Sequence, residues 1–145
     1  MTTAEADSAT ADDLSRTLGL VQRLEMNPEG RARIEYEAGL HMCHSGGVVQ
    51  GGFVSGWIDA AMAHAVIAMA GNTVVPMSLE LKVSFFAPAR PGRVIAEAWV
   101  ERRGKSTCFM EGRLLDPAGQ VLAKASSTIR LASRERVEAS ARAAG

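Results

Sequence analysis

The sequence has little of several features that would identify a function directly. It contains only two cysteines, Cys43 and Cys108, which are far apart and form no Cys-x-x-Cys motif. Two such residues provide no disulfide framework, so we expect free thiols in a cytoplasmic protein. The 16 basic residues balance the 16 acidic ones. The chain therefore lacks the excess of positive charge that would favour binding to a nucleic acid or to an anionic membrane.

The N-terminal residues also lack a targeting signal. Residues 1–14 contain no basic stretch followed by an apolar one, which a signal peptide would need. We expect a disordered tail over residues 1–12, one domain over residues 13–132, and a C-terminal tail over residues 133–145 that is either a frayed helix or disordered. A chain of this length is large enough to bury a core of its own.

Hydrophobic periodicity predicts six strands and one long helix. Residues alternate between apolar and polar in six segments, namely 20–26, 31–38, 77–86, 93–103, 105–115 and 120–132. The segment 52–70 predicts a helix that is apolar on nearly every side, and such a helix must be enclosed. We therefore predict an α+β fold in which a six-stranded antiparallel sheet wraps around one long central helix. Because one helix cannot cover all of the sheet, we expect a second subunit to cover an edge or a face.

The stretch from Gly51 to Ala70 is about as long as a membrane span. Asp59 and His64 lie near its middle, where a carboxylate would be costly in lipid. No cation lies within four residues of Asp59. On a helical wheel Asp59 shares a stripe with the smallest side chains of the segment, Gly52, Gly56, Ala63 and Ala70. We predict a helix within a soluble domain, with no contact to a membrane.

Two interpretations of Asp59 follow from this stripe. In the first, its carboxylate caps a neighbouring loop by accepting backbone N–H bonds. In the second, the small side chains form a cleft and the carboxylate reacts there. His64 lies about 140° away around the helix, so we expect no pair between His64 and Asp59 within one chain.

The order of elements and two segments resemble the hotdog-fold thioesterases, in particular the PaaI-type and 4-hydroxybenzoyl-CoA thioesterase branch. The segments are VVQGGFVSGWIDAAMAHAV and MSLELKVSFFAPARPGRVIAEAWVERRGKS, and the resemblance runs from about residue 18 to residue 131. The pattern at its centre is a Gly-Gly pair with an acid seven residues after the second glycine. In this chain those residues are Gly51, Gly52 and Asp59.

The resemblance implies hydrolysis of an acyl-CoA thioester without a metal or other cofactor. It assigns Asp59 as nucleophile or general base, and the backbone N–H of Gly51 as a donor to the thioester carbonyl. The position of the family's Asn or Gln is His44 here, and Ser78 matches a Ser or Thr that often lines the site. Because two subunits share each site in the family, the resemblance also implies a homodimer or homotetramer in which His44 and Gly51 face the partner subunit's Asp59.

The chain departs from the family at two positions. It has Gln50-Gly51-Gly52 where the family usually has His-Gly-Gly, and His44 replaces the amide. Both substitutes can donate hydrogen bonds, but a histidine can also accept a hydrogen bond or titrate. Gln50 either contacts the substrate or holds the loop, and we expect Gly52 to contact the substrate. The alternative function is therefore a non-catalytic hotdog protein that binds acyl thioesters.

Three further groups of residues have two interpretations each. The run His41-Met42-Cys43-His44 contains metal-ligating side chains, but no second cluster accompanies it, so we expect no metal site. Arg102, Arg103 and Lys105 flank a predicted hairpin turn, where they form either a solvated tip or a site for the phosphates of coenzyme A. The aromatic residues Trp57, Phe85 and Phe86 line either an acyl pocket or the core.

Overall fold

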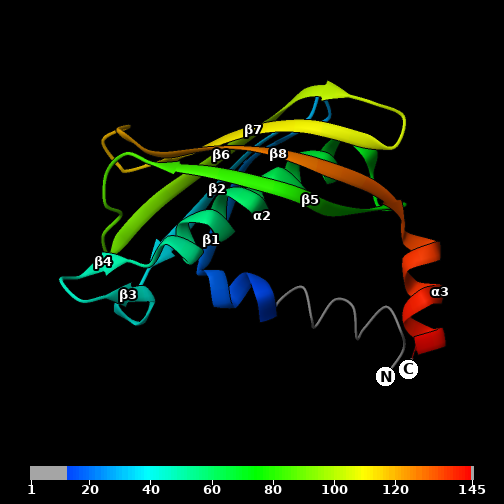
Figure 1. Cartoon of the computed structure of the whole chain (residues 1–145). Coiled ribbons are helices and arrows are strands. Elements are labelled where there is room, and N and C mark those ends of the chain that lie inside the picture. The colour runs from blue at the N-terminus through cyan, green and yellow to red at the C-terminus, as the bar shows by residue number, and fades with distance from the viewer. Residues whose placement is uncertain (1–12, 145) are drawn as a thin grey trace.

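The computed structural model describes residues 13–144, and it is an antiparallel sheet curved around one long helix (Figure 1). The tail expected over residues 1–12 lies outside the described residues. The sheet has the strand order β1-β2-β6-β7-β8-β5. Its strands are β1 Leu20–Asn27, β2 Arg31–Ala38, β5 Val74–Phe85, β6 Gly92–Arg103, β7 Thr107–Leu115 and β8 Val121–Ser133. The helix is α2, Gly51–Ala70. The predicted α+β fold is confirmed.

One face of α2 packs against the concave face of the sheet and forms the core. Its buried residues are Val54, Trp57, Ile58, Ala61, Met62, Ala65 and Val66. Gly112 of β7 allows the closest approach, because a Cβ atom at this position would lie 2.8 Å from Ile58 and 3.0 Å from the carbonyl oxygen of Glu97. A side chain there would push the helix off the centre of the sheet.

The opposite face of α2 carries the small-residue stripe. None of Gly52, Gly56, Asp59, Ala63 and Ala70 is buried. A short helix over residues 13–18 lies near this side of α2, and the indole N–H of Trp57 donates to the carbonyl oxygen of Leu18 at 2.7 Å. By length and composition alone α2 could cross a membrane. In the fold one face of α2 is buried in the core, and the other carries the small residues.

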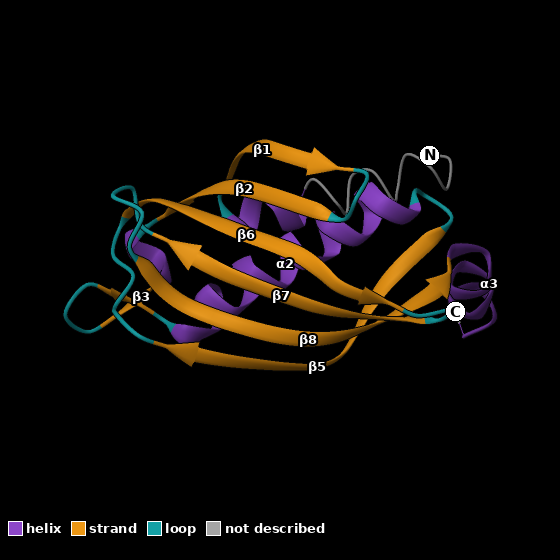
Figure 2. Cartoon of the chain, turned by 90° about the horizontal axis from the view of Figure 1, so that it is seen from above, coloured by secondary structure: helices purple, strands orange, loops and turns teal. Residues whose placement is uncertain are grey.

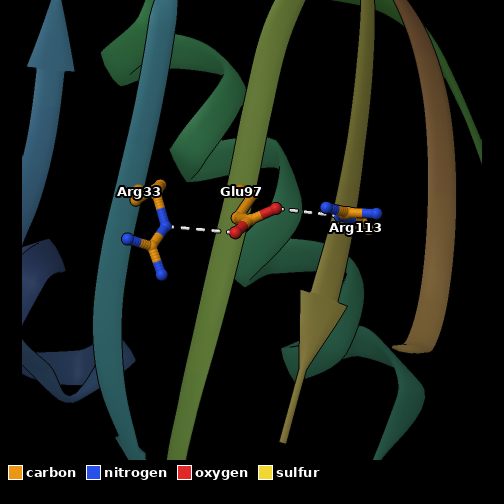
Figure 3. Close-up of polar contacts among 3 residues, drawn as sticks. All are labelled: Arg33, Glu97 and Arg113. Atoms are coloured by element: carbon orange, nitrogen blue, oxygen red, sulfur yellow. Dashed lines mark hydrogen bonds and ion pairs between the residues drawn. The ribbon is translucent and has the colours of Figure 1, made fainter. Parts of the chain in front are cut away.

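On the convex face of the sheet, ion pairs connect the three neighbouring strands β2, β6 and β7. Glu97 of β6 lies opposite Arg33 of β2 and Arg113 of β7 in the strand register. Its two carboxylate oxygens accept from the Nε atoms of these arginines, at 3.0 and 2.8 Å respectively (Figure 3). Arg31 and Arg113 also lie over the ring of Trp99. Pairs directly opposite one another on neighbouring strands stabilise the sheet and its register.

The strand β5 is one edge of the sheet and is unusual in its exposed apolar side chains. Met77, Leu79 and Phe85 are 45%, 59% and 56% exposed, respectively. The pairing of β5 with β8 shifts register between Ser78 and Glu80, so Leu79 forms a bulge. An exposed apolar edge strand is a template for pairing with another chain.

The two ends of the molecule differ from the sequence-based expectations in detail (Figures 1 and 2). At one end the Gly-rich loop contains a short 3₁₀ helix, Leu40–Met42, and a two-residue hairpin of β3 (Cys43–His44) and β4 (Val48–Val49). At the other end β8 continues into α3, Arg134–Ala144. Helix was one of the two states expected for this tail.

Candidate active site

The N-terminus of α2 presents a backbone donor that the protein itself does not use. Gln50 is the N-cap, and its side-chain oxygen accepts from the backbone N–H of Gly52 at 2.7 Å. Among residues 13–144, no hydrogen bond is recorded for the N–H of Gly51. The first N–H groups of a helix have no partner within the helix and favour negative charge. The amide of Gly51 is therefore available to an incoming carbonyl oxygen, whereas that of Gly52 is occupied.

A cleft of about 410 Å³ opens beside Gly51. Its lining residues come from the β3–β4 hairpin, the start of α2, the last residue of β5 and the segment after it: His44, Val48, Val49, Gly51, Val54, Phe85, Phe86, Ala87, Pro88 and Ala89. Phe85 and Phe86 are more than half exposed, whereas Trp57 is fully buried. From the sequence, these three aromatic residues could line either the core or an acyl pocket. The structure puts Trp57 in the core and both phenylalanines in the cleft.

Gly51 also lies close to the ring of Phe85 in this cleft. A Cβ atom at position 51 would lie 3.2 Å from Cζ of Phe85, which is tighter than ordinary van der Waals contact. Because glycine has no side chain, the ring of Phe85 can lie close to the N-terminus of α2. This gives Gly51 a steric role in addition to its free amide.

His44 lies in the same cleft, at the exposed end of β3. Its Nδ1 atom is 3.1 Å from the carbonyl oxygen of Ser45. If Nδ1 carries the proton and donates to that carbonyl, Nε2 is left as an acceptor; the other tautomer would leave Nε2 as a donor. The structure thus brings together His44, Gln50 and Gly51 at one end of the molecule.

Asp59 lies further along α2 and is held by Ser78. The hydroxyl of Ser78 donates to Oδ1 of Asp59 at 2.7 Å, although 19 residues separate them. Ser78 faces α2 because it pairs with Ile129, a core residue of β8. Asp59 is half-buried, and its second carboxylate oxygen has no recorded partner among residues 13–144. Asp59 is thus oriented by one donor while one oxygen stays free.

The predicted site residues do not form one site within a single chain. Gly51 and Asp59 are eight residues apart on a straight helix, which is about 12 Å along its axis. That distance is too long for both to touch one thioester carbonyl. Arg102, Arg103 and Lys105 are exposed at the β6–β7 turn, towards the end of the molecule that carries α3. The structure therefore shows three separate groups of predicted site residues.

Three other titratable groups are perturbed by burial and lie outside these groups. Burial raises the pKa of Tyr36 to about 12, and its hydroxyl has no hydrogen-bond partner among residues 13–144. Burial lowers the pKa of His64, whose Nδ1 is 2.7 Å from the carbonyl oxygen of Ala60. Burial also raises the pKa of the Cys108 thiol. His64 makes no recorded contact with Asp59 in the described chain, in line with the helical wheel.

The described residues offer no evident metal site. Across residues 13–144, no three His, Cys, Asp or Glu side chains lie close enough together to hold a metal ion. Cys43 and Cys108 are both free thiols.

Comparisons with known proteins identify the family and the fold. The family profile described as the Thioesterase superfamily matches residues 46–123, which is more than half of the chain. A phenylacetic acid degradation-related protein from Ralstonia eutropha JMP134 is 29% identical, with a TM-score of 0.76 over 82% of this chain and 89% of that one. No curated protein shows a significant sequence match.

Two further solved structures share the fold. The PaaI protein of the E. coli phenylacetic acid degradation operon is 19% identical, with a TM-score of 0.77 over 88% of this chain and 89% of that one. The TT0310 protein from Thermus thermophilus is 24% identical, with a TM-score of 0.73 over 83% and 97% of the two chains. The matched profile supports acyl thioester hydrolysis as the general activity. With its sheet curved around α2, the chain belongs to the thioesterase superfamily, as a hotdog-fold protein of the PaaI type.

Proposed function

We propose that the protein hydrolyses acyl-CoA thioesters to a free acid and the CoA thiol. The observation that carries this proposal is the unbonded N–H of Gly51 at the start of α2, beside an open cleft. Thioester hydrolysis builds negative charge on the carbonyl oxygen. A preorganised backbone donor at a helix N-terminus stabilises that charge.

Asp59 supplies the reactive group in this proposal. As a general base, its free carboxylate oxygen takes a proton from water while the water oxygen attacks the carbonyl carbon. The C–S bond then breaks, and the same proton passes from Asp59 to the departing thiolate. As a nucleophile, Asp59 would attack the carbonyl carbon itself. The C–S bond would then break, the CoA thiolate would leave and take a proton from solvent, and water would cleave the resulting anhydride to the free acid and the Asp59 carboxylate. The hydrogen bond from Ser78 orients the carboxylate in either case.

A complete site requires two copies of the chain. Because Gly51 and Asp59 are about 12 Å apart along α2, the donor and the carboxylate must come from different subunits to act on one carbonyl. The exposed edge strand β5 and the unburied stripe of α2 offer surfaces for such a contact. We infer a homodimer, alone or as half of a homotetramer, in which His44 and Gly51 of one subunit meet the partner's Asp59.

The basic turn is proposed to contact the substrate away from the reacting centre. Arg102, Arg103 and Lys105 are all exposed, and CoA carries phosphates to which such cations would bind. A solvated turn with no ligand remains the simpler alternative. Kinetic constants of variants at these three residues distinguish a phosphate contact from a solvated turn, because loss of a phosphate contact raises KM and leaves kcat unchanged.

A second candidate function is binding of acyl thioesters without hydrolysis. It is favoured by Gln50, whose side-chain oxygen caps Gly52 and which is not among the lining residues of the cleft, although its position is that of the histidine usual in the family. A panel of acyl-CoA esters, with release of free thiol followed by a thiol reagent, tests both functions. Turnover of any member supports the hydrolase. Saturable binding of the panel with no thiol release would instead support the binding protein.

A further inference from the structure

A second cavity lies at the other end of the molecule, between α3 and the ends of β5 and β8. Its volume is about 610 Å³, within the range of roughly 300–1,000 Å³ found for small-molecule sites. Figures 1 and 2 show α3 leaving the sheet at this end, beside the strand ends. The cavity is lined by Met77, Ser106, Arg130, Leu131, Ala132, Ser133, Arg136, Val137, Ser140, Ala141 and Ala144.

The charged side chains that line this cavity are all positive. Arg130 of β8 and Arg136 of α3 are its cations, and none of the lining residues is acidic. Among the ion pairs recorded for residues 13–144, none involves either arginine. The neighbouring Arg134, by contrast, donates to the carbonyl oxygen of Asn72 and pairs with Glu138. The guanidinium groups of Arg130 and Arg136 are therefore available to bind an anion.

The rest of the lining is suited to an amphipathic ligand. Met77, Leu131 and Val137 supply apolar surface, and three serines supply hydroxyl groups. Arginine pairs with phosphate through two parallel hydrogen bonds, and apolar side chains cover the faces of a purine ring. A ligand that carries both a heterocycle and phosphates meets both requirements. A simple inorganic anion would leave the apolar part uncovered.

The cavity is continuous with the basic turn. The N–H of Leu131 donates to the carbonyl oxygen of Ser106 at 2.8 Å, and Arg130 pairs with Thr107 across β7 and β8. Ser106, at the end of the basic turn, therefore lines the cavity together with Arg130. Met77 is adjacent in sequence to Ser78, which binds Asp59. The cavity thus lies between the basic turn and β5, the strand that carries Ser78.

We infer that this cavity holds the nucleotide end of the CoA substrate, with Arg130 and Arg136 bound to its phosphates and α3 covering its base. The inference rests on the proposed function and adds an element outside the matched family profile, since α3 follows residue 123. An acyl group attached to a carrier protein would have no adenine to fill the apolar lining.

The test is a titration with adenosine 3′,5′-bisphosphate, which is the nucleotide end of CoA without its thiol arm. Arg130→Ala and Arg136→Ala should each weaken binding about 10-fold, the loss typical of one hydrogen bond to a charged group. Each should also raise KM for the acyl-CoA ester and leave kcat unchanged. Arg142→Ala removes the same charge from α3 outside the lining and should change neither value. Melting temperatures identify any variant that fails to fold.

A truncated thioester separates this inference from the proposed function. With the N-acetylcysteamine ester of the same acyl group, the arginine variants should match the wild type, because this ester has no nucleotide. Wild-type protein that binds the bisphosphate but releases no thiol from any ester would defeat the proposed hydrolase and leave the cavity assignment standing. Folded Arg130→Ala/Arg136→Ala protein with wild-type affinity for the bisphosphate would overturn the assignment. So would turnover of carrier-protein thioesters with no binding of the bisphosphate, because the basic surface would then face a protein.

Discussion

The hydroxyl of Ser78 on the edge strand β5 donates to Oδ1 of Asp59 on α2, at 2.7 Å. This bond connects two elements. One is the exposed edge strand β5, and the other is the face of α2 that carries the small-residue stripe. It fixes one carboxylate oxygen and leaves the other free. The bulge at Leu79 follows directly after Ser78, and bulges near reactive sites commonly redirect a side chain.

Replacing Asp59 with Asn tests whether this carboxylate reacts. The amide keeps the shape of the side chain, and its oxygen can still accept from Ser78. We expect kcat to fall about 10²–10⁴-fold, the usual contribution of a positioned acid or base, with the melting temperature and the oligomeric state unchanged. If Asp59 were only a cap, the variant would lose about 1–3 kcal/mol of stability and keep its turnover per folded molecule. Steady-state kinetics and thermal melting on the same sample distinguish these outcomes.

Gly51 should tolerate alanine in the fold but not in the reaction. Alanine is a better helix former than glycine by up to about 1 kcal/mol, so stability should hold or rise. The new methyl group would lie 3.2 Å from Phe85 and would crowd the carbonyl that the free amide is proposed to bind. We expect kcat/KM to fall at least about 10-fold. The double variant Gly51→Ala/Phe85→Leu is the control: recovery of activity would assign the loss to the clash with Phe85 rather than to crowding of the substrate.

The contact between subunits can be tested at the bulge of β5. Leu79 is 59% exposed, and Leu79→Lys would add a charge to the edge strand, which opposes pairing with another strand. We expect sedimentation to show a shift towards monomer and hydrolysis to be lost with it, because the proposed site needs two copies of the chain. Phe109→Lys is the matched control, since Phe109 is 47% exposed but lies on the interior strand β7. Fully active, monomeric Leu79→Lys protein would contradict the shared site.

Much of this fold could be predicted from the sequence because its elements have clear periodicities. The alternation of Val94, Ala96 and Ala98 identifies a half-buried strand, and all three are buried in β6. The apolar helix was predicted over residues 52–70 and is observed over Gly51–Ala70. The predicted start of β5 at residue 77 was three residues late. A proline such as Pro76 often marks the boundary of a strand, but an edge strand tolerates it.

The parts that could not be predicted depend on tertiary contacts. The strands β3 and β4 have two residues each, too few for a periodicity. The bond between Ser78 and Asp59 joins residues 19 positions apart on different elements, so only the family resemblance suggested that they share a site. The α3 cavity forms because a small, charged tail folds beside β8. Its composition alone left helix and disorder equally open.

The basic turn provides a further test, with a readout that differs from that of Asp59. If Arg102, Arg103 and Lys105 contact CoA phosphates, their combined replacement with alanine should raise KM and leave kcat nearly unchanged. The effect should shrink as salt rises, because exposed charges are screened beyond about 10 Å near 0.1 M ionic strength. Arg93→Ala, at the opposite end of β6, should not affect KM. A triple variant with the KM of the wild type would assign the turn to a solvated tip.

Tyr36 makes stability depend on pH in the alkaline range. Burial raises its pKa from 10.0 to about 12, so the folded state retains the phenol proton after the unfolded state has lost it. The stability that this contributes is complete below pH 10 and is lost as the pH rises through about 12. Two pKa units correspond to about 2–3 kcal/mol.

Tyr36→Phe isolates this effect from the other groups that titrate at high pH. The variant removes a buried hydroxyl that has no partner among residues 13–144, so at pH 7 it should be as stable as the wild type or up to about 1 kcal/mol more stable. Stacking with Trp57, at a centroid distance of 6.1 Å, needs only the ring. Urea unfolding at several pH values should show the wild type losing about 2–3 kcal/mol relative to the variant between pH 10 and pH 12. Parallel curves for the two proteins would mean that the phenol of Tyr36 ionises as readily in the folded state as in the unfolded one.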